Sequence, residues 1–401
     1  MRPLKRLIQL DEALEFVMEK AVPARKTETV PITDATGRVA AEGVFSKLDV
    51  PPFSRAAMDG YAVRAKDTFG ASKLKPVRMR VLEEIYAGSV PKTALRSMEC
   101  AEIATGAMLP RGADSVVMVE DTEKEGASVT IGEAVHPGQN VSRIGEDMSK
   151  GTKAISKGDV LNPSKVGALA AIGLKSVRVY SKPLVAVVPT GNEIAPLGKT
   201  LVPGQVYDIN SYTLSSVVAL NGGLPRKLDI ADDSLEDLLK VVRDNKDCDM
   251  LVFSGGSSVG ERDVMLDVLE RMGEVIFHGV ALKPGKPTLF GTIGRQLVFG
   301  MPGYPTSCLS NAYIFLAPAL RKMARLSSGS PRTVTARMAK RVVSTTGRTQ
   351  FLTVKLDGDT AHPAFKESGA ITSMAFADGY VIIPADVDLL ERGERVEVHL
   401  L

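Results

Sequence analysis

Apolar and polar residues follow two different periods along this chain. Over residues 10–21 apolar side chains recur three or four positions apart, which predicts a helix with Asp11 as its cap. Over residues 46–140 short apolar segments are separated by Gly and Pro turns, which is typical of β-strands. From residue 184 apolar runs such as LVAVVP alternate with helical segments, and short β segments return after residue 331.

This order predicts a multidomain fold of the α/β plus β class. Strands that alternate with helices over 181–328 indicate a three-layer α/β domain with a parallel-rich sheet covered on both faces. We expect residues 46–140 to be a β-rich domain inserted into a discontinuous N-terminal domain, made of residues 1–45 and 141–180. Residues 329–401 are expected to form a small β-barrel-like domain.

Composition narrows the function. The 401 residues carry 50 basic and 47 acidic side chains, and a net charge of +3 argues against a nucleic-acid-binding protein. No apolar run approaches the ~20 residues that span a bilayer, and the charged N-terminus does not resemble a signal peptide, so a cytoplasmic protein is expected. Cys100, Cys248 and Cys308 have no paired spacing, which disfavours a disulfide framework.

Four polar loops follow predicted strands, where open α/β sheets bind ligands. They are PTGNE (189–193), SGGSSVGERD (254–263), LKPGKP (282–287) and MPGYPTS (301–307).

The second of these loops has the composition of a phosphate site. Gly255 and Gly256 allow close backbone approach, and Ser254 and Ser257 supply hydroxyls. The next helix begins near Asp263, so its free N–H groups can face an anion. Asp263 either caps that helix or holds Mg²⁺ against a pyrophosphate.

The third loop holds two cations in a stiff turn. Lys283 and Lys286 are separated by Pro-Gly and followed by Pro, and two fixed cations suit a dianion such as phosphate or an oxometalate. Solvated surface lysines are the alternative. In the fourth loop, Ser307 and its backbone N–H lie at a helix start, unless the loop is only a tight connection.

Carboxylates accompany these loops. Each could approach a metal or a ligand, or could serve only as a polar turn or helix-capping residue: Glu193, Asp208, Asp232 and Asp233.

Taken in order, longer motifs resemble one family across essentially the whole chain. They are DVPPFSRAAMDGYAV (49–63), TGAMLPRGADSVVMVE (105–120), RIGEDMSKG (143–151), PTGNEI, GQVYDIN, SGGSSVGERD, LKPGKP and PGYPTS. The family is that of the molybdopterin molybdenumtransferases, which includes the bacterial molybdenum insertase and the C-terminal domain of gephyrin.

The resemblance implies a four-domain homodimer whose α/β domain is of the molybdopterin-binding type. Its active site would lie between the third domain of one subunit and the second domain of the other. The implied substrates are adenylylated molybdopterin (molybdopterin-AMP) and molybdate or tungstate, with Mg²⁺ as cofactor. The implied reaction hydrolyses the phosphate linkage, releases AMP and leaves the metal on the dithiolene. Transient partners would be the molybdopterin adenylyltransferase and the apoenzymes that accept the cofactor, with no nucleic acid and no membrane.

The resemblance also assigns roles to matching positions. Lys283, Lys286 and Ser307 would form the oxometalate and phosphate cradle. Further substrate contacts would come from Ser254, Gly255, Gly256, Ser257, Asp208, Arg348 and Ser373. The acidic groups around Mg²⁺ and the scissile linkage would be Glu193, Asp263 and one of Asp232 and Asp233. Asp59 and Thr105 would reach the site from the second domain, Asp59 as a catalytic residue and Thr105 as a substrate contact.

One position departs from the family. Many members have Asn where this chain has Tyr304, and Tyr lacks the paired donor and acceptor of an amide, so the choice between molybdate and tungstate stays open. Two other functions also stay open: the preceding step, adenylyl transfer from ATP to the pterin, which the α/β domain alone would allow, and a scaffold without catalysis.

Overall fold

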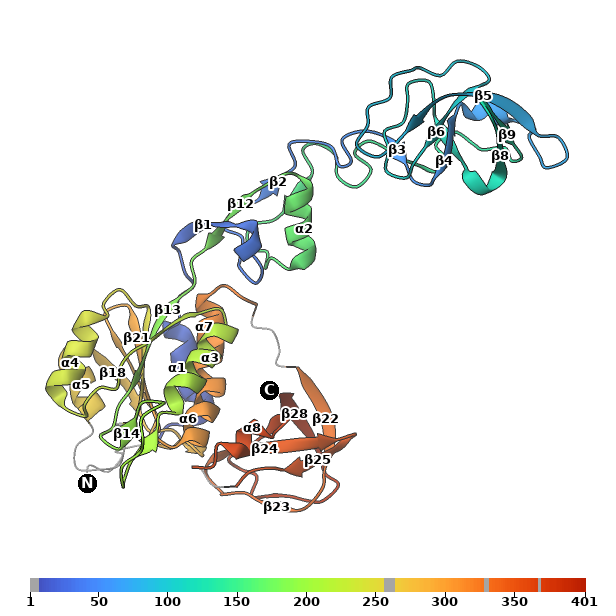
Figure 1. The fold of residues 1–401 in the computed structure, drawn as a ribbon. Helices are drawn as coiled ribbons and strands as arrows, with labels where there is room; N and C mark the ends of the chain where they lie inside the picture. Colours follow the sequence, from blue (N-terminus) through green and yellow to red (C-terminus); the bar gives the residue numbers. More distant parts are fainter. Residues whose placement is uncertain (1–6, 256–263, 328–331, 367–368) are drawn as a thin grey trace. The chain divides into compact units, whose positions relative to one another are not determined.

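A computed structural model describes residues 7–255, 264–327, 332–366 and 369–401 of the chain. The chain divides into two compact units, Met1–Glu28 with Tyr180–Leu401, and Thr29–Val179 (Figure 1).

The first unit contains a six-stranded sheet with the strand order β16-β13-β17-β21-β20-β18. The first four strands pair in parallel and the last two antiparallel. Their bounds are β13 (Leu184–Pro189), β16 (Leu224–Lys227), β17 (Met250–Ser254), β18 (Glu274–His278), β20 (Leu289–Ile293) and β21 (Gln296–Met301). Strand β16 pairs with β13 from Leu224 to Lys227, at one edge of the sheet.

Helices cover both faces of this sheet, as Figure 1 shows. Val185 and Val187 pack into one core with α1 (Leu10–Lys20), α3 (Asn210–Leu220), α6 (Pro305–Asn311) and α7 (Ala317–Met323). Ala186 and Val188 project to the other face, against α4 (Leu235–Asp244) and α5 (Val264–Met272). Because side chains alternate along a strand, a strand buried on both faces reads as a continuous apolar run. The predicted three-layer α/β domain is confirmed.

The N-terminal helix belongs to this α/β core. Its buried Leu10, Ala13 and Val17 pack among α7 and the π-helical segment η4 (Ala312–Leu316). The sequence grouped this helix with residues 141–180, because a chain-order argument cannot tell which apolar face a helix will meet. Asp11 is not its cap: the N-cap is Gln9, and Asp11 lies in the first turn.

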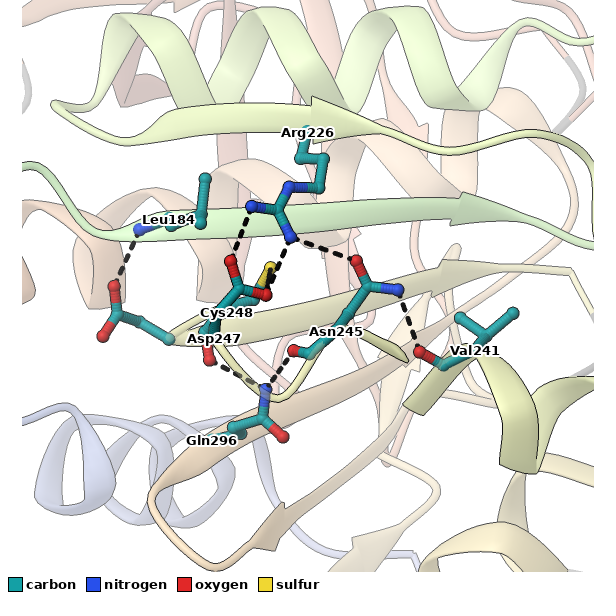
Figure 2. Close-up of polar contacts among 8 residues, drawn as sticks. Leu184, Arg226, Val241, Asn245, Asp247, Cys248 and Gln296 are labelled. Atoms are coloured by element: carbon teal, nitrogen blue, oxygen red, sulfur yellow. Dashed lines mark hydrogen bonds and ion pairs between the residues drawn. The ribbon is translucent and has the colours of Figure 1, made fainter. Parts of the chain in front are cut away.

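The amino-terminal edge of the sheet is closed by a polar network, shown in Figure 2. Arg226 donates two hydrogen bonds to Asp247, at 2.8 and 2.7 Å, and this ion pair holds the pKa of Asp247 below its usual value. Gln296 donates to the carbonyls of Asn245 and Cys248 at 2.8 and 2.7 Å. These polar groups therefore bind one another, and this edge offers little to a ligand.

The C-terminal region is a closed barrel. Its strands are β22 (Thr333–Met338), β24 (Thr349–Asp357), β25 (Thr360–Pro363), β26 (Gly379–Ile383) and β28 (Arg395–Leu400). They pair in the order β24-β25-β22-β28-β26, and a pairing between β26 and β24 closes the ring. The predicted barrel-like domain is confirmed. Short strands β23 (Val342–Val343) and β27 (Leu389–Leu390) and helix α8 (Thr372–Ala375) complete it.

The second unit contains a six-stranded sheet with the order β7-β4-β6-β5-β9-β8. Its strands are β4 (Gly60–Val63), β5 (Val77–Ile85), β6 (Glu99–Ile103), β7 (Ser115–Met118), β8 (Thr122–Glu125) and β9 (Ser128–Ile131). A separate apolar core forms around helix α2 (Pro163–Ala171). Asn162 caps this helix: its Oδ1 accepts from Lys165 N at 2.9 Å. The short pairs around these cores are β1 (Thr27–Pro31) with β12 (Ser176–Tyr180), β2 (Val44–Phe45) with β11 (Lys153–Ile155), and β3 (Arg55–Ala56) with β10 (Val141–Ser142).

Candidate functional site

The described parts of the four predicted loops lie at the carboxyl edge of the α/β sheet. The strand register places Pro189 beside Ser254 and Ser254 beside Met301. Beyond the strands, Thr190 N donates to Ser254 O at 3.0 Å and Gly255 N donates to Met301 O at 3.3 Å. The antiparallel strand β20 begins beside Gly300, so the lysine loop that precedes β20 lies at this edge as well.

The acidic candidates at this edge have unequal surroundings. Glu193 is exposed, and its carboxylate lies close to Gly191. Asp232 and Asp233 are exposed just beyond Ala231, which pairs with Thr190. Asp208 is buried and accepts hydrogen bonds from the backbone N–H and hydroxyl of Ser211. Gly256, Ser257 and Asp263 lie outside the described residues.

Asp208 also meets a cation. Its Oδ2 lies 3.8 Å from the ammonium of Lys227, which in turn lies 4.9 Å from the ring centre of Tyr212. Asp208 thus accepts hydrogen bonds from the first turn of α3, although the N-cap residue of that helix is Ile209.

Hydrogen bonds from Asn311 and Thr288 hold the turn between the two lysines. Asn311 on α6 donates to Gly285 O at 3.2 Å and to Thr288 Oγ1, and Thr288 Oγ1 donates to Gly285 O at 2.7 Å. Gly285 has a φ of +115°, and a Cβ at this position would lie 2.3 Å from Asn311 Oδ1. Position 285 therefore requires glycine, and the backbone of the turn packs directly against Asn311.

The barrel contributes directly to the lysine loop. Strand β19 (Leu282–Lys283) pairs in parallel with the start of β24, with Lys283 beside Gln350. The Lys283 ammonium donates to Thr345 Oγ1 at 2.8 Å. Within the described part of the chain, the charged groups of Lys286 and Arg348 have no hydrogen-bond or ion-pair partner, and both side chains are half-buried.

The fourth loop is fixed between α3 and the barrel. Asn210 Nδ2 donates to Gly303 O at 2.8 Å, and Thr306 Oγ1 donates to Ala370 O at 3.0 Å. Ser307 is buried at the start of α6, whereas the side chain of Tyr304 is 66% exposed and does not cap that helix. Ser373 is fully buried, and its hydroxyl accepts from Lys366 N at 3.1 Å.

Asp59 and Thr105 form a pair in the second unit, 46 positions apart in sequence. Asp59 Oδ1 accepts from Thr105 N at 2.7 Å and from Thr105 Oγ1 at 2.9 Å. These two hydrogen bonds, the backbone one foremost, hold the pKa of Asp59 below its usual value of 3.8. The sequence named both residues but gave no reason to expect direct contact.

A pocket of about 210 Å³ lies beside Asp59 and is lined in part by Glu84, Tyr86 and Glu102. Lys124 donates to Glu102 at 2.5 Å and to Glu84 at 2.9 Å, and these bonds raise the pKa of the lysine. The pocket wall is therefore acidic, with one cation shared between two carboxylates.

A magnesium site is not formed by the described carboxylates alone. Among the residues with described positions, no three Asp, Glu, His or Cys side chains come close enough to hold a metal ion. Glu193, Asp232 and Asp233 therefore do not make up a metal-ligand set by themselves, and we assign no step to Mg²⁺.

The sequence did not identify two residues of the site, Thr345 and Asn311. Thr345 binds Lys283, and Asn311 supports the turn at Gly285. The STTGRT segment around Thr345 carries a turn signal, but nothing local links it to residue 283. Asn311 lies within a helix, where an amide has no distinctive spacing.

Comparison with known proteins shows which family combines these parts. Residues 8–173 match the MoeA N-terminal region (domain I and II), residues 186–322 a probable molybdopterin binding domain, and residues 335–401 the MoeA C-terminal region (domain IV). The chain thus has the domain composition of a molybdopterin-binding protein of several domains.

Whole-length relatives agree. A putative molybdopterin biosynthesis protein of Methanocaldococcus jannaschii is 34% identical, with all of both chains covered. The molybdopterin molybdenumtransferase of Bacillus subtilis is 32% identical, over 98% of this chain and 94% of its own. A molybdopterin biosynthesis MoeA protein of Pyrococcus horikoshii has a solved structure with a TM-score of 0.83 and 44% identity, covering 98% of this chain and 99% of its own. The chain belongs to the MoeA family, whose members include the molybdopterin molybdenumtransferase enzymes.

Two further expectations can be compared with the structure. Cys100, Cys248 and Cys308 are all buried and free, and burial raises the pKa of Cys100 to about 12. No helix in the described ranges is long and apolar enough to cross a membrane.

Proposed function

We propose that this enzyme is a molybdopterin molybdenumtransferase that acts on adenylylated molybdopterin. In the proposed reaction, molybdate or tungstate enters the dithiolene, the phosphate linkage is hydrolysed and AMP is released. The observation that carries the proposal is the meeting of the lysine turn with the loops at Thr190, Gly255 and Met301, at one edge of the α/β sheet. This edge brings two cations close to the loops that follow three parallel strands.

The negative charges of the proposed substrates explain why the site needs cations. An oxometalate dianion, a charged phosphate linkage and two thiolates repel one another, so bringing them together requires cations that are already in place. Lys283 and Lys286 would bind the oxometalate and hold it close to the thiolates, which are soft ligands suited to such a metal. Ser307, Arg348 and the Ser254–Gly255 loop would bind phosphate and oxometalate oxygens.

Other assignments complete the proposal. Glu193 and Asp232 are carboxylates at the same edge, and Mg²⁺ remains the expected cofactor for the phosphate linkage, with Asp263 as an expected ligand. Asp59 and Thr105 would serve from the second domain. A homodimer, a cytoplasmic location and transient contact with the adenylyltransferase and acceptor apoenzymes are further expectations. The alternative of adenylyl transfer predicts likeness in the α/β domain alone, whereas matches also cover residues 8–173 and 335–401.

The test is nucleotide release. Purified protein loaded with adenylylated molybdopterin should release AMP only after molybdate or tungstate is added, and comparing the two anions determines the metal preference. Removing both cations in Lys283→Ala with Lys286→Ala should lower the rate at least tenfold, since each charge-assisted contact contributes roughly 1.5–3 kcal/mol. Lys355→Ala, which removes an exposed lysine from the far part of β24, should leave the rate unchanged. Equal rates in the double variant and the parent would refute the cradle.

A further inference from the structure

The two lysines of the LKPGKP turn are held in different ways. The backbone at Lys283 is part of the barrel sheet, because β19 pairs with β24 and Thr349 N donates to Ala281 O at 2.9 Å. Its ammonium is fixed as well, by the 2.8 Å hydrogen bond to Thr345 Oγ1. Lys286 has no such side-chain partner in the described ranges. One cation is therefore fixed and the other is adaptable.

Thr345 is itself well anchored. Its carbonyl accepts from Arg348 N at 3.3 Å, which closes the turn that presents both residues. On either side, Ser344 N donates to Asp388 O and Gly347 N donates to Ala385 O, each at 2.8 Å. These hydrogen bonds fix the backbone of Thr345 in the barrel, and the Thr345 hydroxyl in turn holds the Lys283 ammonium.

The partner of Lys283 is polar but uncharged. Ser344 and Gln350 beside it are buried, and in the described part of the chain Ser344 Oγ and Gln350 Oε1 lack a hydrogen-bond partner. No carboxylate lies within ion-pair distance of the Lys283 ammonium among the described residues. A carboxylate would neutralise the cation and compete with an incoming anion, whereas a hydroxyl orients it and leaves its charge intact.

We propose that Thr345 is a positioning residue that holds the Lys283 ammonium ready for the oxometalate. The hydroxyl accepts one of the three N–H groups and leaves two for the dianion. Lys283 thus loses less side-chain freedom when the anion arrives, which strengthens anion binding. The barrel, through Thr345, sets the affinity of the α/β site for the anion. This inference rests on the proposed function for its ligand but not for its geometry.

The test compares Thr345→Val, which removes the hydroxyl at nearly constant shape, with Thr345→Ser, which keeps it. At saturating adenylylated molybdopterin, the valine variant should need roughly three- to tenfold more molybdate for half-maximal AMP release, the size expected for ordering one long side chain. Its maximal rate should change less than its half-saturating concentration, and the serine variant should behave as the parent. Thr346→Val, an exposed neighbour, is the control. A merely structural role would lower thermal stability and maximal rate without moving the molybdate dependence.

A second readout does not depend on the reaction. Amine-reactive labelling of the intact protein, followed by mass spectrometry, should show Lys283 labelled faster in Thr345→Val, with Lys286 unchanged. Unchanged labelling together with an unchanged molybdate dependence would overturn the positioning role, as would failure of Thr345→Ser to restore both. If the parent protein releases no AMP with either oxometalate, the proposed function fails, and the labelling result still decides the role of Thr345.

Discussion

At the residue scale, a threonine hydroxyl binds each of two charged groups that we assign to the site, Lys283 and Asp59. Thr345 holds an ammonium, and Thr105 holds the carboxylate of Asp59 through its hydroxyl as well as its backbone N–H. Asp59 is exposed, so water screens it, and the local hydrogen bonds account for its lowered pKa. The effect of the Thr105 hydroxyl can therefore be measured by titration of Asp59.

Replacing Thr105 with Val should raise the pKa of Asp59 towards 3.8 but not fully, because the backbone hydrogen bond remains. A carboxyl group with a lowered folded-state pKa stabilises the protein above its unfolded pKa, and that stability is lost as pH falls through the folded pKa. The difference in stability between parent and variant should thus be present at neutral pH and vanish in acid. NMR titration of the Asp59 carboxyl group would measure the shift, and Thr105→Ser should retain the parent value. An identical titration curve in the valine variant would contradict the prediction.

At the element scale, a two-residue strand connects the two domains of the first unit. Strand β19 contributes Leu282 and Lys283 to the barrel sheet, while the following turn rests on Asn311 of α6. The turn therefore contacts both the α/β domain and the barrel. We expect substitution of Gly285 to disturb its conformation.

Gly285→Ala tests this element. The φ of +115° disfavours any side chain, at a cost of roughly 1–3 kcal/mol, and the added Cβ would collide with Asn311 Oδ1. We expect a larger loss of unfolding free energy than for Gly294→Ala, where φ is +60° but no atom lies within 4 Å of the added Cβ. Denaturant unfolding of both variants measures the difference. Equal losses would show that Asn311 does not confine the turn.

Sequence analysis predicted the parts of this site that depend on local pattern. The runs LVAVV, DMLVF and QLVF identify strands, and their carboxyl ends necessarily bring Thr190, Gly255 and Pro302 to one edge. Pairing between Lys283 and Gln350 could not be predicted, because two-residue strands carry no periodicity and their partners lie 67 positions apart. The position of the N-terminal helix was missed for a different reason. Its apolar face is recognisable in the sequence, but the sequence does not show which core that face packs against.

At the scale of the whole molecule, the chain forms two units with separate cores. In the second unit, Leu169 of helix α2 is fully buried, and in the first unit Leu214 of helix α3 is fully buried. Because no apolar core cluster has members in both units, we expect each unit to unfold as a transition of its own.

Calorimetry of the full chain should therefore show two transitions, which core variants can assign. Leu169→Ala should lower the stability of one transition by roughly 2–5 kcal/mol, the range for a buried leucine truncated to alanine, and leave the other in place. Leu214→Ala, matched in chemistry and burial, should do the reverse. If each variant shifts only one transition, a loss of activity can be assigned to one unit: the first, which holds the lysine turn, or the second, which holds Asp59. If both variants shift both transitions equally, the two units unfold as one, and activity losses could not be assigned to either.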